Sequence, residues 1–446
     1  MGRKRRRQGS LWVAASELPK AASHPFYARL NGLLAAGSFD RFAEQQCERY
    51  YAPVMGRPSL APGRYFRLLM VGYFEGLDSE RGIAWRAADS LALRAFVGLA
   101  LEEHAPDHST ISRTRRLIDI ETHRAVFAWV HERLAGSGLL VGKTIGIDAT
   151  TLEANAAMRN IVRRDNGETY PEFLKGLATA SGVKTPTREA LARLDRRRKK
   201  KTSNKDWKSP TDPDARITKM KDGRTHLAYK AEHAVDLETG AIVAVTIQGA
   251  DEGDTSSIPA TLTEAVEHVD VALAADGGEP FHELGVWEVV TDKGYHSAAV
   301  VKEIQDLGLR TYISEPDRGR QKWEGKAEAQ AAVYANRRRS RRAKSKRLHR
   351  LRSERVERSF AHMYETGGMR RVHLRGRENI LKRVLIHGSA LNVGLLMRKA
   401  IGAGTPRGFG AILTSMCVAA LNALRTPLRW VTPSTIDNVH CAYHAA

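Results

Sequence analysis

Residues 226–248 read HLAYKAEHAVDLETGAIVAVTIQ. Two runs that alternate between apolar and polar side chains flank a short link, residues 237–240, which ends in glycine. A short glycine-containing link between two alternating runs is the sequence pattern of a β-hairpin. The stretch therefore predicts two strands, 226–236 and 241–248, paired antiparallel, and the rest of the chain has to be placed around them.

Further strand and helix patterns surround this hairpin. An apolar run at 140–150 (LVGKTIGIDAT) precedes it and predicts a buried strand. After the hairpin come a helix from 254 to about 269, a strand at 288–291, a helix to about 307, a strand at 310–314 and helices at about 353–364 and 379–399. This order predicts an α/β domain with a mixed sheet flanked by helices, as in the ribonuclease H-like fold.

The region before residue 137 shows helical patterns instead. Apolar residues recur at three- and four-residue spacing over 64–76, 79–90 and 118–134. We expect a basic flexible arm at 1–24 and an all-α domain for DNA binding or assembly at 25–137. The α/β domain is expected at 138–400, with basic insertions at about 153–222 and 317–352, and a C-terminal tail at 401–446.

The charge balance points to a polyanionic partner. The chain has 71 Lys and Arg against 50 Asp and Glu, a formal net charge of +21. A phosphate backbone binds such an excess through released counterions, although a basic surface that only contacts solvent has the same composition. Three scattered cysteines argue against a disulfide framework or a zinc site. The apolar segments are shorter than the ~20 residues of a membrane span. We expect a cytoplasmic, nucleoid-associated protein without membrane contact.

Three carboxylates stand in short motifs far apart in the chain. Asp148 lies in IGIDAT and Asp292 in VVTDKGYHS, each near the end of a predicted strand, and Glu357 lies in RVERSFAHMY, in a predicted helix. Carboxylates brought together from distant segments suit a pair of hard divalent cations. Two Mg²⁺ ions about 4 Å apart can hold the attacking and leaving oxygens of a phosphoryl transfer, and Mn²⁺ can substitute for them.

Together GIDAT, YKAEHAVD, TDKGY and VERSFAHMY…MRR resemble the DDE transposases of bacterial insertion sequences, among the IS4 and IS5 relatives and especially the IS1182-like branch. The resemblance covers roughly residues 30–400 and includes the segment DHSTISR. It implies that Asp148, Asp292 and Glu357 are the catalytic metal ligands. It also implies an enzyme that binds the terminal inverted repeats of its own element, hydrolyses the DNA there and joins the 3′-hydroxyl ends to target DNA. Two paired ends imply a homodimer in the synaptic complex.

The sequence departs from the family around the glutamate. The family often has an arginine four residues before it and a lysine seven residues after it, where this chain has Ser353 and Tyr364. This departure leaves Glu354 as a rival third ligand. The family spacing from glutamate to phenylalanine, here Phe360, favours Glu357.

Several basic residues are candidates for contacts with double-stranded DNA. Lys293 and Arg358 adjoin the acids and could hold phosphate oxygens, whereas Lys230 and His233 on the hairpin are weaker candidates and a structural role suits His233 better. The helix after Asp107 resembles the recognition helix of a helix-turn-helix unit, although an ordinary amphipathic helix with a basic face looks the same. The further candidates on that helix and in the basic insertions are Arg113, Arg115, Arg116, Arg197, Lys200, Arg338 and Arg341.

Each acid alone has an ordinary structural explanation, as a turn residue, a helix cap or half of an ion pair. Their combination favours the enzyme. One alternative is a DNA-binding repressor or an inactive transposase relative, and the loss of an acid would indicate it. Another is a structure-specific ribonuclease H-like nuclease, which would cut DNA without joining strands.

Overall fold

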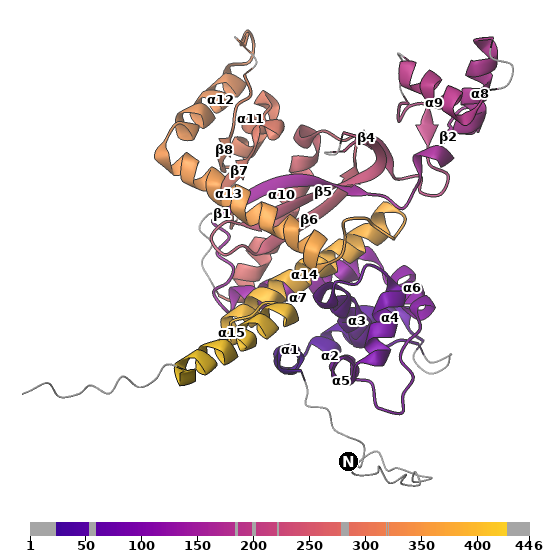
Figure 1. Cartoon of the computed structure of the whole chain (residues 1–446). Helices are drawn as coiled ribbons and strands as arrows, with labels where there is room; N and C mark the ends of the chain where they lie inside the picture. Colours follow the sequence, from indigo (N-terminus) through magenta and orange to yellow (C-terminus); the bar gives the residue numbers. More distant parts are fainter. Residues whose placement is uncertain are drawn as a thin grey trace, which may run out of the picture.

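The computed structural model describes residues 24–52, 59–182, 186–198, 202–220, 223–277, 285–317, 319 and 321–425. A mixed sheet with helices on its faces forms the centre, with a helical region below it and a small insertion that projects above it (Figure 1). The predicted α/β class, with an all-α region preceding the sheet, is confirmed.

The main sheet is built around the long strand β5. Its strands are β1 (Thr144–Glu153), β4 (Arg216–Lys219), β5 (Thr225–Asp236), β6 (Ile242–Gly249), β7 (Glu288–Thr291) and β8 (Arg310–Ile313). β5 pairs antiparallel with β1 on one side and with β4 and β6 on the other. β7 lies parallel to β1, and β8 lies parallel to β7. The predicted hairpin is therefore confirmed as β5 and β6.

Helices cover both faces of this sheet. On one face α10 (Asp254–Ala275) and α11 (Ala298–Asp306) pack on Ile145 and Ile147 of β1. On the other face α13 (Ala343–Ala361) crosses the strands (Figure 1), and Gly146 of β1 lies directly beneath it. Successive residues of a strand point to opposite faces. Asp148 therefore shares the α13 face with Gly146.

The helical region has well-defined helix ends. It contains α1 (Pro25–Ala36), α2 (Phe39–Cys47), η2 (Glu48–Tyr50), α3 (Pro62–Glu75), α4 (Glu80–Asp89), α5 (Leu91–Val97), α6 (His108–Leu117) and α7 (Ile120–Ala135). Side-chain oxygens of Ser79, Ser90, Asp107 and Asp119 accept hydrogen bonds from backbone N–H groups at the starts of α4 to α7. Such caps satisfy amides that have no partner within the helix.

The helical region and the sheet share one hydrophobic core through α14 (Arg377–Ile401). Phe127 of α7, Leu152 of β1 and Val384 of α14 all belong to that core. Asn392 of α14 also bonds the backbone N–H and C=O of Ile242, at 2.9 and 2.8 Å, and so covers the edge strand β6. By length and composition, the stretch Arg377–Ala411 is long and apolar enough to cross a membrane. However, 83% of the apolar 18-residue segment within it is buried inside the protein.

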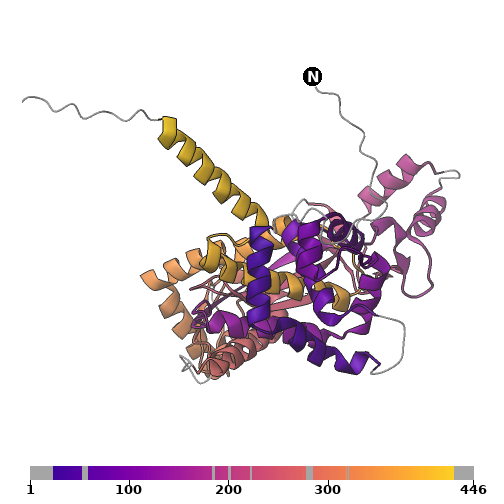
Figure 2. The same cartoon turned by 90° about the horizontal axis from the view of Figure 1, so that it is seen from below.

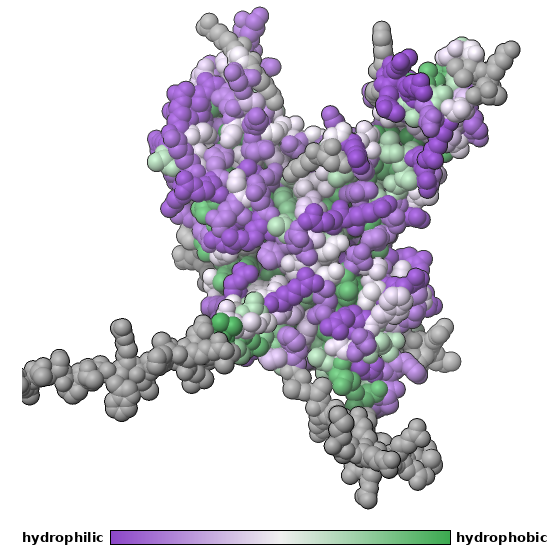
Figure 3. All heavy atoms as spheres, viewed as in Figure 1, coloured by the Kyte–Doolittle hydropathy of each residue, from purple (hydrophilic) through white to green (hydrophobic). Residues whose placement is uncertain are grey.

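The insertion after β1 has a small core of its own. It contains η3 (Met158–Asn160), β2 (Val162–Arg163), α8 (Tyr170–Ala180), α9 (Arg188–Arg197) and β3 (Trp207–Lys208). Tyr170 and Phe173 pack edge-on against Trp207, with ring centroids 5.2 Å away in each case. Figure 3 shows this insertion and the lobe around α12 as two mainly hydrophilic projections with a hollow between them.

Two segments differ from the sequence-based expectation. The basic stretch read as an insertion at 317–352 forms α12 (Ala327–Ser340) and the first half of α13, where Leu348 packs against Val290 and Tyr312. The many arginines and lysines of this stretch interrupt its apolar periodicity, so its buried positions do not stand out in the sequence. The segment expected as a tail contains α15 (Pro406–Arg425), which projects from the body of the protein (Figure 2).

Candidate active site

Asp148 lies in β1, and Asp292 directly follows the neighbouring parallel strand β7. The register of β1 and β7 places Gly146 opposite Val290. Two residues further along each strand direction, the next side chains on the same face are those of Asp148 and Asp292. Burial raises the pKa of Asp148, and the charge of Asp292 raises it further, while Arg352 opposes both effects. The charges of the two carboxylates therefore affect one another.

Arg352 of α13 covers the first of these carboxylates. Its Nη1 donates to Oδ2 of Asp148 at 2.6 Å, and the two side chains are only 11% and 24% exposed. The aliphatic stem of Arg352 passes over Gly146, so that a Cβ at this position would lie 3.1 Å from Cγ of the arginine. The same Cβ would lie only 2.6 Å from Cδ2 of Leu237, so glycine suits the close packing over this part of β1.

Glu357 is exposed on the same helix. His349 precedes it by eight residues in α13, and Tyr364 follows it by seven, in the π-helical turn His362–Thr366 that continues α13. His349 Nε2 lies 3.5 Å from Oγ of Ser314, just after β8, and the Tyr364 hydroxyl lies 2.7 Å from Oγ1 of Thr150 in β1. Glu357 therefore stands between two side chains that both contact these strand ends.

The rival acid Glu354 lies on another side of α13. It is exposed and accepts a hydrogen bond from Arg358 at 2.8 Å. The neighbouring Arg355 reaches Gly240 in the β5–β6 turn, at the opposite end of β1. Within the described ranges, no group of three or more His, Cys, Asp or Glu residues is arranged to hold a metal ion. The structure thus assembles the two aspartates and leaves Glu357 on the adjacent helix.

A buried glutamate lies behind the two aspartates, on the opposite face of the sheet. Glu232 of β5 is fully buried. It accepts hydrogen bonds from the hydroxyls of Tyr295, at 2.7 Å, and Ser257, at 2.9 Å, and from Thr261. Tyr295 ends η4 (Lys293–Tyr295), the turn that Asp292 caps by accepting from the N–H of Gly294. This network holds the turn that carries the second aspartate.

Sequence reasoning did not single out Glu232 or Tyr295. The available signal was a glutamate two residues after a lysine inside an otherwise apolar strand, because buried charges are rarely left without partners. That lysine, Lys230, is 5% exposed, and its Nζ lies 2.6 Å from Asp254 and donates to Ser257 at 2.8 Å. His233 is also buried, with Nδ1 2.9 Å from Oγ of Ser359, and burial lowers its pKa to about 3. Both are core residues.

Comparison with known families agrees with this geometry. Residues 17–117 match a family model described as a transposase domain (DUF772), and residues 180–393 match the transposase DDE domain. The chain belongs to the DDE transposases, in the IS1182-like group. The DDE domain has the ribonuclease H-like fold, and this family acts on DNA, generally with divalent metal ions. Asp292 and Glu357 lie inside the matched region, whereas Asp148 precedes it. A comparison with curated proteins finds no match.

The basic residues of this transposase differ in their access to DNA. Arg115 is only 7% exposed, because its guanidinium forms an ion pair with Glu80 of α4 and its Nε lies 3.3 Å from Asn379 of α14. Arg115 therefore joins helices, which corrects its assignment as a DNA contact. Lys200 lies outside the described residues. The remaining candidates are exposed: Arg113, Arg116, Arg197, Lys293, Arg338, Arg341 and Arg358.

Proposed function

We propose that this transposase binds the terminal inverted repeats of its own insertion sequence, hydrolyses the DNA phosphodiester at the ends and joins the 3′-hydroxyl ends to target DNA. The observation that carries the proposal is the parallel register of β1 and β7, which brings Asp148 beside Asp292. The helix that bears Glu357 crosses the same face of the sheet (Figure 1).

Asp148, Asp292 and Glu357 are the proposed ligands of two Mg²⁺ ions, which Mn²⁺ could replace. The carboxylates fit this role, since hard divalent cations take oxygen ligands and keep places for water and substrate oxygens. Bound ions would activate the attacking water and stabilise the departing 3′ oxygen. Arg352 is ion-paired with Asp148 and would have to share this carboxylate with a bound ion. Lys293, which is exposed and adjacent to Asp292 in the chain, would hold a phosphate oxygen.

The exposed arginines give the proposed DNA a path over the protein. Arg113 and Arg116 stand on the outer side of α6, while Arg197 and Arg338 lie on the two hydrophilic projections. The hollow between these projections (Figure 3) is the place we assign to the DNA. Two element ends must be held together, so the working complex is a homodimer, which acts on cytoplasmic, nucleoid-associated DNA.

A cleavage assay tests this function. A plasmid with the gene and its own flanking DNA is incubated with Mg²⁺ and either the wild-type protein or Asp292→Ala. Cuts at two boundaries that flank the gene, made by the wild type alone, are the expected result. Tight binding at those boundaries without any cut, at several metal concentrations, would instead indicate a DNA-binding relative without activity.

A further inference from the structure

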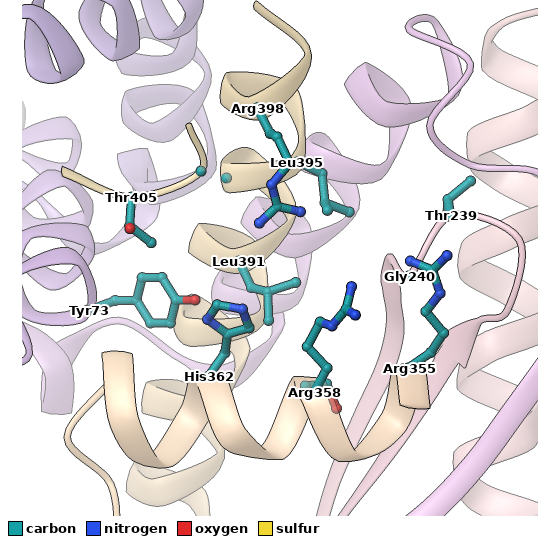
Figure 4. A pocket seen from close by; sticks show the side chains of 13 residues that line it. Tyr73, Thr239, Gly240, Arg355, Arg358, His362, Leu391, Leu395, Arg398 and Thr405 are labelled. Carbon is teal, nitrogen blue, oxygen red and sulfur yellow. The ribbon is translucent and has the colours of Figure 1, made fainter. Parts of the chain in front are cut away.

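A pocket lined by arginines lies on the side of α13 away from Glu357. Arg355 and Arg358 come from α13, and Arg398 comes from the last turn of α14. Figure 4 shows the side chains of Arg358 and Arg398 pointing into the same space from two helices, with Arg355 beside them. Thr239 in the β5–β6 turn adds a hydroxyl to the lining. Segments far apart in the sequence thus bring three cations to one cavity.

The positive charge of this pocket is poorly compensated. No acid lines it, and the exposed Glu354 pairs with Arg358. In the part of the chain that the structure describes, no acidic side chain pairs with Arg355 or Arg398, and Nε of Arg355 is buried without a hydrogen-bond partner. Burial lowers the pKa of His362 in the same lining, and so do Arg398 and Arg358. Like charges this close repel one another unless an anion lies between them.

The size of the pocket limits what can bind there. The space open to the centres of water molecules is about 30 Å³. A single water needs roughly 10–15 Å³ by that measure, so the cavity has room for a few waters or one small anion. A nucleoside or a peptide is too large. Guanidinium groups present several N–H donors in a planar fork that matches the oxygens of a phosphate.

We propose that the pocket formed by Arg355, Arg358 and Arg398 binds one phosphate-type oxyanion, separate from the site of the three acids. A bound anion would link α13 to the β5–β6 turn and to the end of α14. It would thereby fix the helix that carries Glu357 from its far side. Two sources offer the same chemistry, free inorganic phosphate and a backbone phosphate of DNA. The DNA source rests on the proposed function, whereas the binding of free phosphate does not.

Phosphate binding to the full-length protein without metal tests the proposal. Isothermal titration with inorganic phosphate compares the wild type with Arg398→Gln and Arg355→Gln, and Arg350→Gln is the matched control, since Arg350 is an exposed arginine of α13 outside the pocket. We expect about tenfold or weaker phosphate binding in both pocket variants, because each loses a charged hydrogen bond. The control should bind like the wild type. Equal binding by all four proteins would overturn the proposal.

A conservative variant covers the case in which the glutamine variants fold poorly. Arg398→Lys keeps the charge and loses the planar fork, so we expect it to bind phosphate more weakly than the wild type and more tightly than Arg398→Gln. Far-ultraviolet circular dichroism in phosphate-free buffer checks the fold of each protein. Full wild-type affinity in a folded Arg398→Lys protein, together with full affinity in Arg355→Gln, would also contradict an arginine-built site.

The salt dependence of DNA binding identifies the source of the phosphate. A labelled duplex is titrated at several salt concentrations, again without metal. If a DNA phosphate occupies the pocket, Arg398→Gln lowers the slope of log affinity against log salt by about 1, since one phosphate contact is lost. An unchanged slope with lost phosphate binding identifies the free anion. Neither measurement needs strand cleavage, so a protein that fails to cut its element ends leaves this inference standing.

Discussion

Arg352 donates a hydrogen bond to Asp148 across 2.6 Å, from the helix that also carries Glu357 to the first aspartate of the proposed metal site. The charge of this aspartate is therefore balanced in part by a side chain of the protein. A divalent ion at Asp148 has to compete with this guanidinium.

Removal of the Arg352 guanidinium from Asp148 should strengthen the binding of the metal ion. In Arg352→Gln we expect half-maximal stabilisation at a Mg²⁺ concentration about tenfold lower than in the wild type, the scale of one lost charged hydrogen bond. The melting temperature is measured against Mg²⁺ concentration, with Arg350→Gln as the control. A higher Mg²⁺ requirement in Arg352→Gln would show that the arginine supports the metal site instead.

Loss of the second aspartate should abolish both metal binding and cleavage. Asp292→Ala removes the acid that directly follows β7, the parallel neighbour of the strand that carries Asp148. We expect no Mg²⁺-induced rise in melting temperature and a fall in cleavage of roughly a thousandfold or more, as when a central charged catalytic group is removed. A Mg²⁺-induced shift equal to that of the wild type would place the metal elsewhere.

The two glutamates of α13 form a matched pair. Glu357→Gln should reduce cleavage as strongly as Asp292→Ala, because it removes the proposed third ligand of the metal ions. Glu354→Gln removes only an exposed pair with Arg358, of the kind that contributes about 0–1 kcal/mol, and should cut DNA like the wild type. The initial rates of plasmid cleavage decide, and the reverse pattern would assign the third ligand to Glu354.

The buried network behind the site should be visible in stability. Tyr295→Phe removes a donor to the fully buried Glu232, which costs about 1–3 kcal/mol when a buried acceptor loses a partner. Urea unfolding at neutral pH measures the change. Tyr334→Phe on the partly exposed α12 is the control and should change the free energy of unfolding little. Equal stability of the two variants would mean that Glu232 does not depend on the tyrosine.

Buried histidines should make the protein sensitive to acid. Burial lowers the pKa of His131 from 6.5 to about 3, with a further contribution from the stacked His268. The unfolded chain then binds the proton first, so stability is fully present above pH 6.5 and is lost as the pH falls toward 3. His131→Gln can keep a donor to the carbonyl of Ile242, which Nε2 now contacts at 2.8 Å.

The free energy of unfolding is compared at pH 7.5 and pH 5 for the wild type and His131→Gln. Between pH 7.5 and pH 5, we expect the free energy of unfolding of His131→Gln to fall by on the order of 1–2 kcal/mol less than that of the wild type. An identical pH dependence would mean that His131 is already protonated in the folded protein at pH 5.

The hairpin, the strand that contains Asp148 and the strand that precedes Asp292 could be predicted because their patterns are local, although β1 continues beyond Asp148 to Glu153. The burial of Arg115 could not, since its partners Glu80 and Asn379 are remote in sequence. The contact between Arg352 and Asp148 depends in the same way on how α13 crosses β1. The first half of α13 was obscured by its charge, although Leu348 anchors it on the sheet. Long-range packing, and not local propensity, determines each of these features.

The shared core of the helical region and the sheet would set the distance along the DNA between the bases that α6 contacts and the bond that is cut. α6 is bonded to α14 through Arg115 and Asn379, and α14 packs in the same core as the sheet. A base sequence read from α6 would therefore lie at a set number of base pairs from the phosphodiester that is cut. The fold would fix the distance between the bases that are read and the bond that is cut. An element end lengthened by one base pair would therefore bring a different phosphodiester to the three acids.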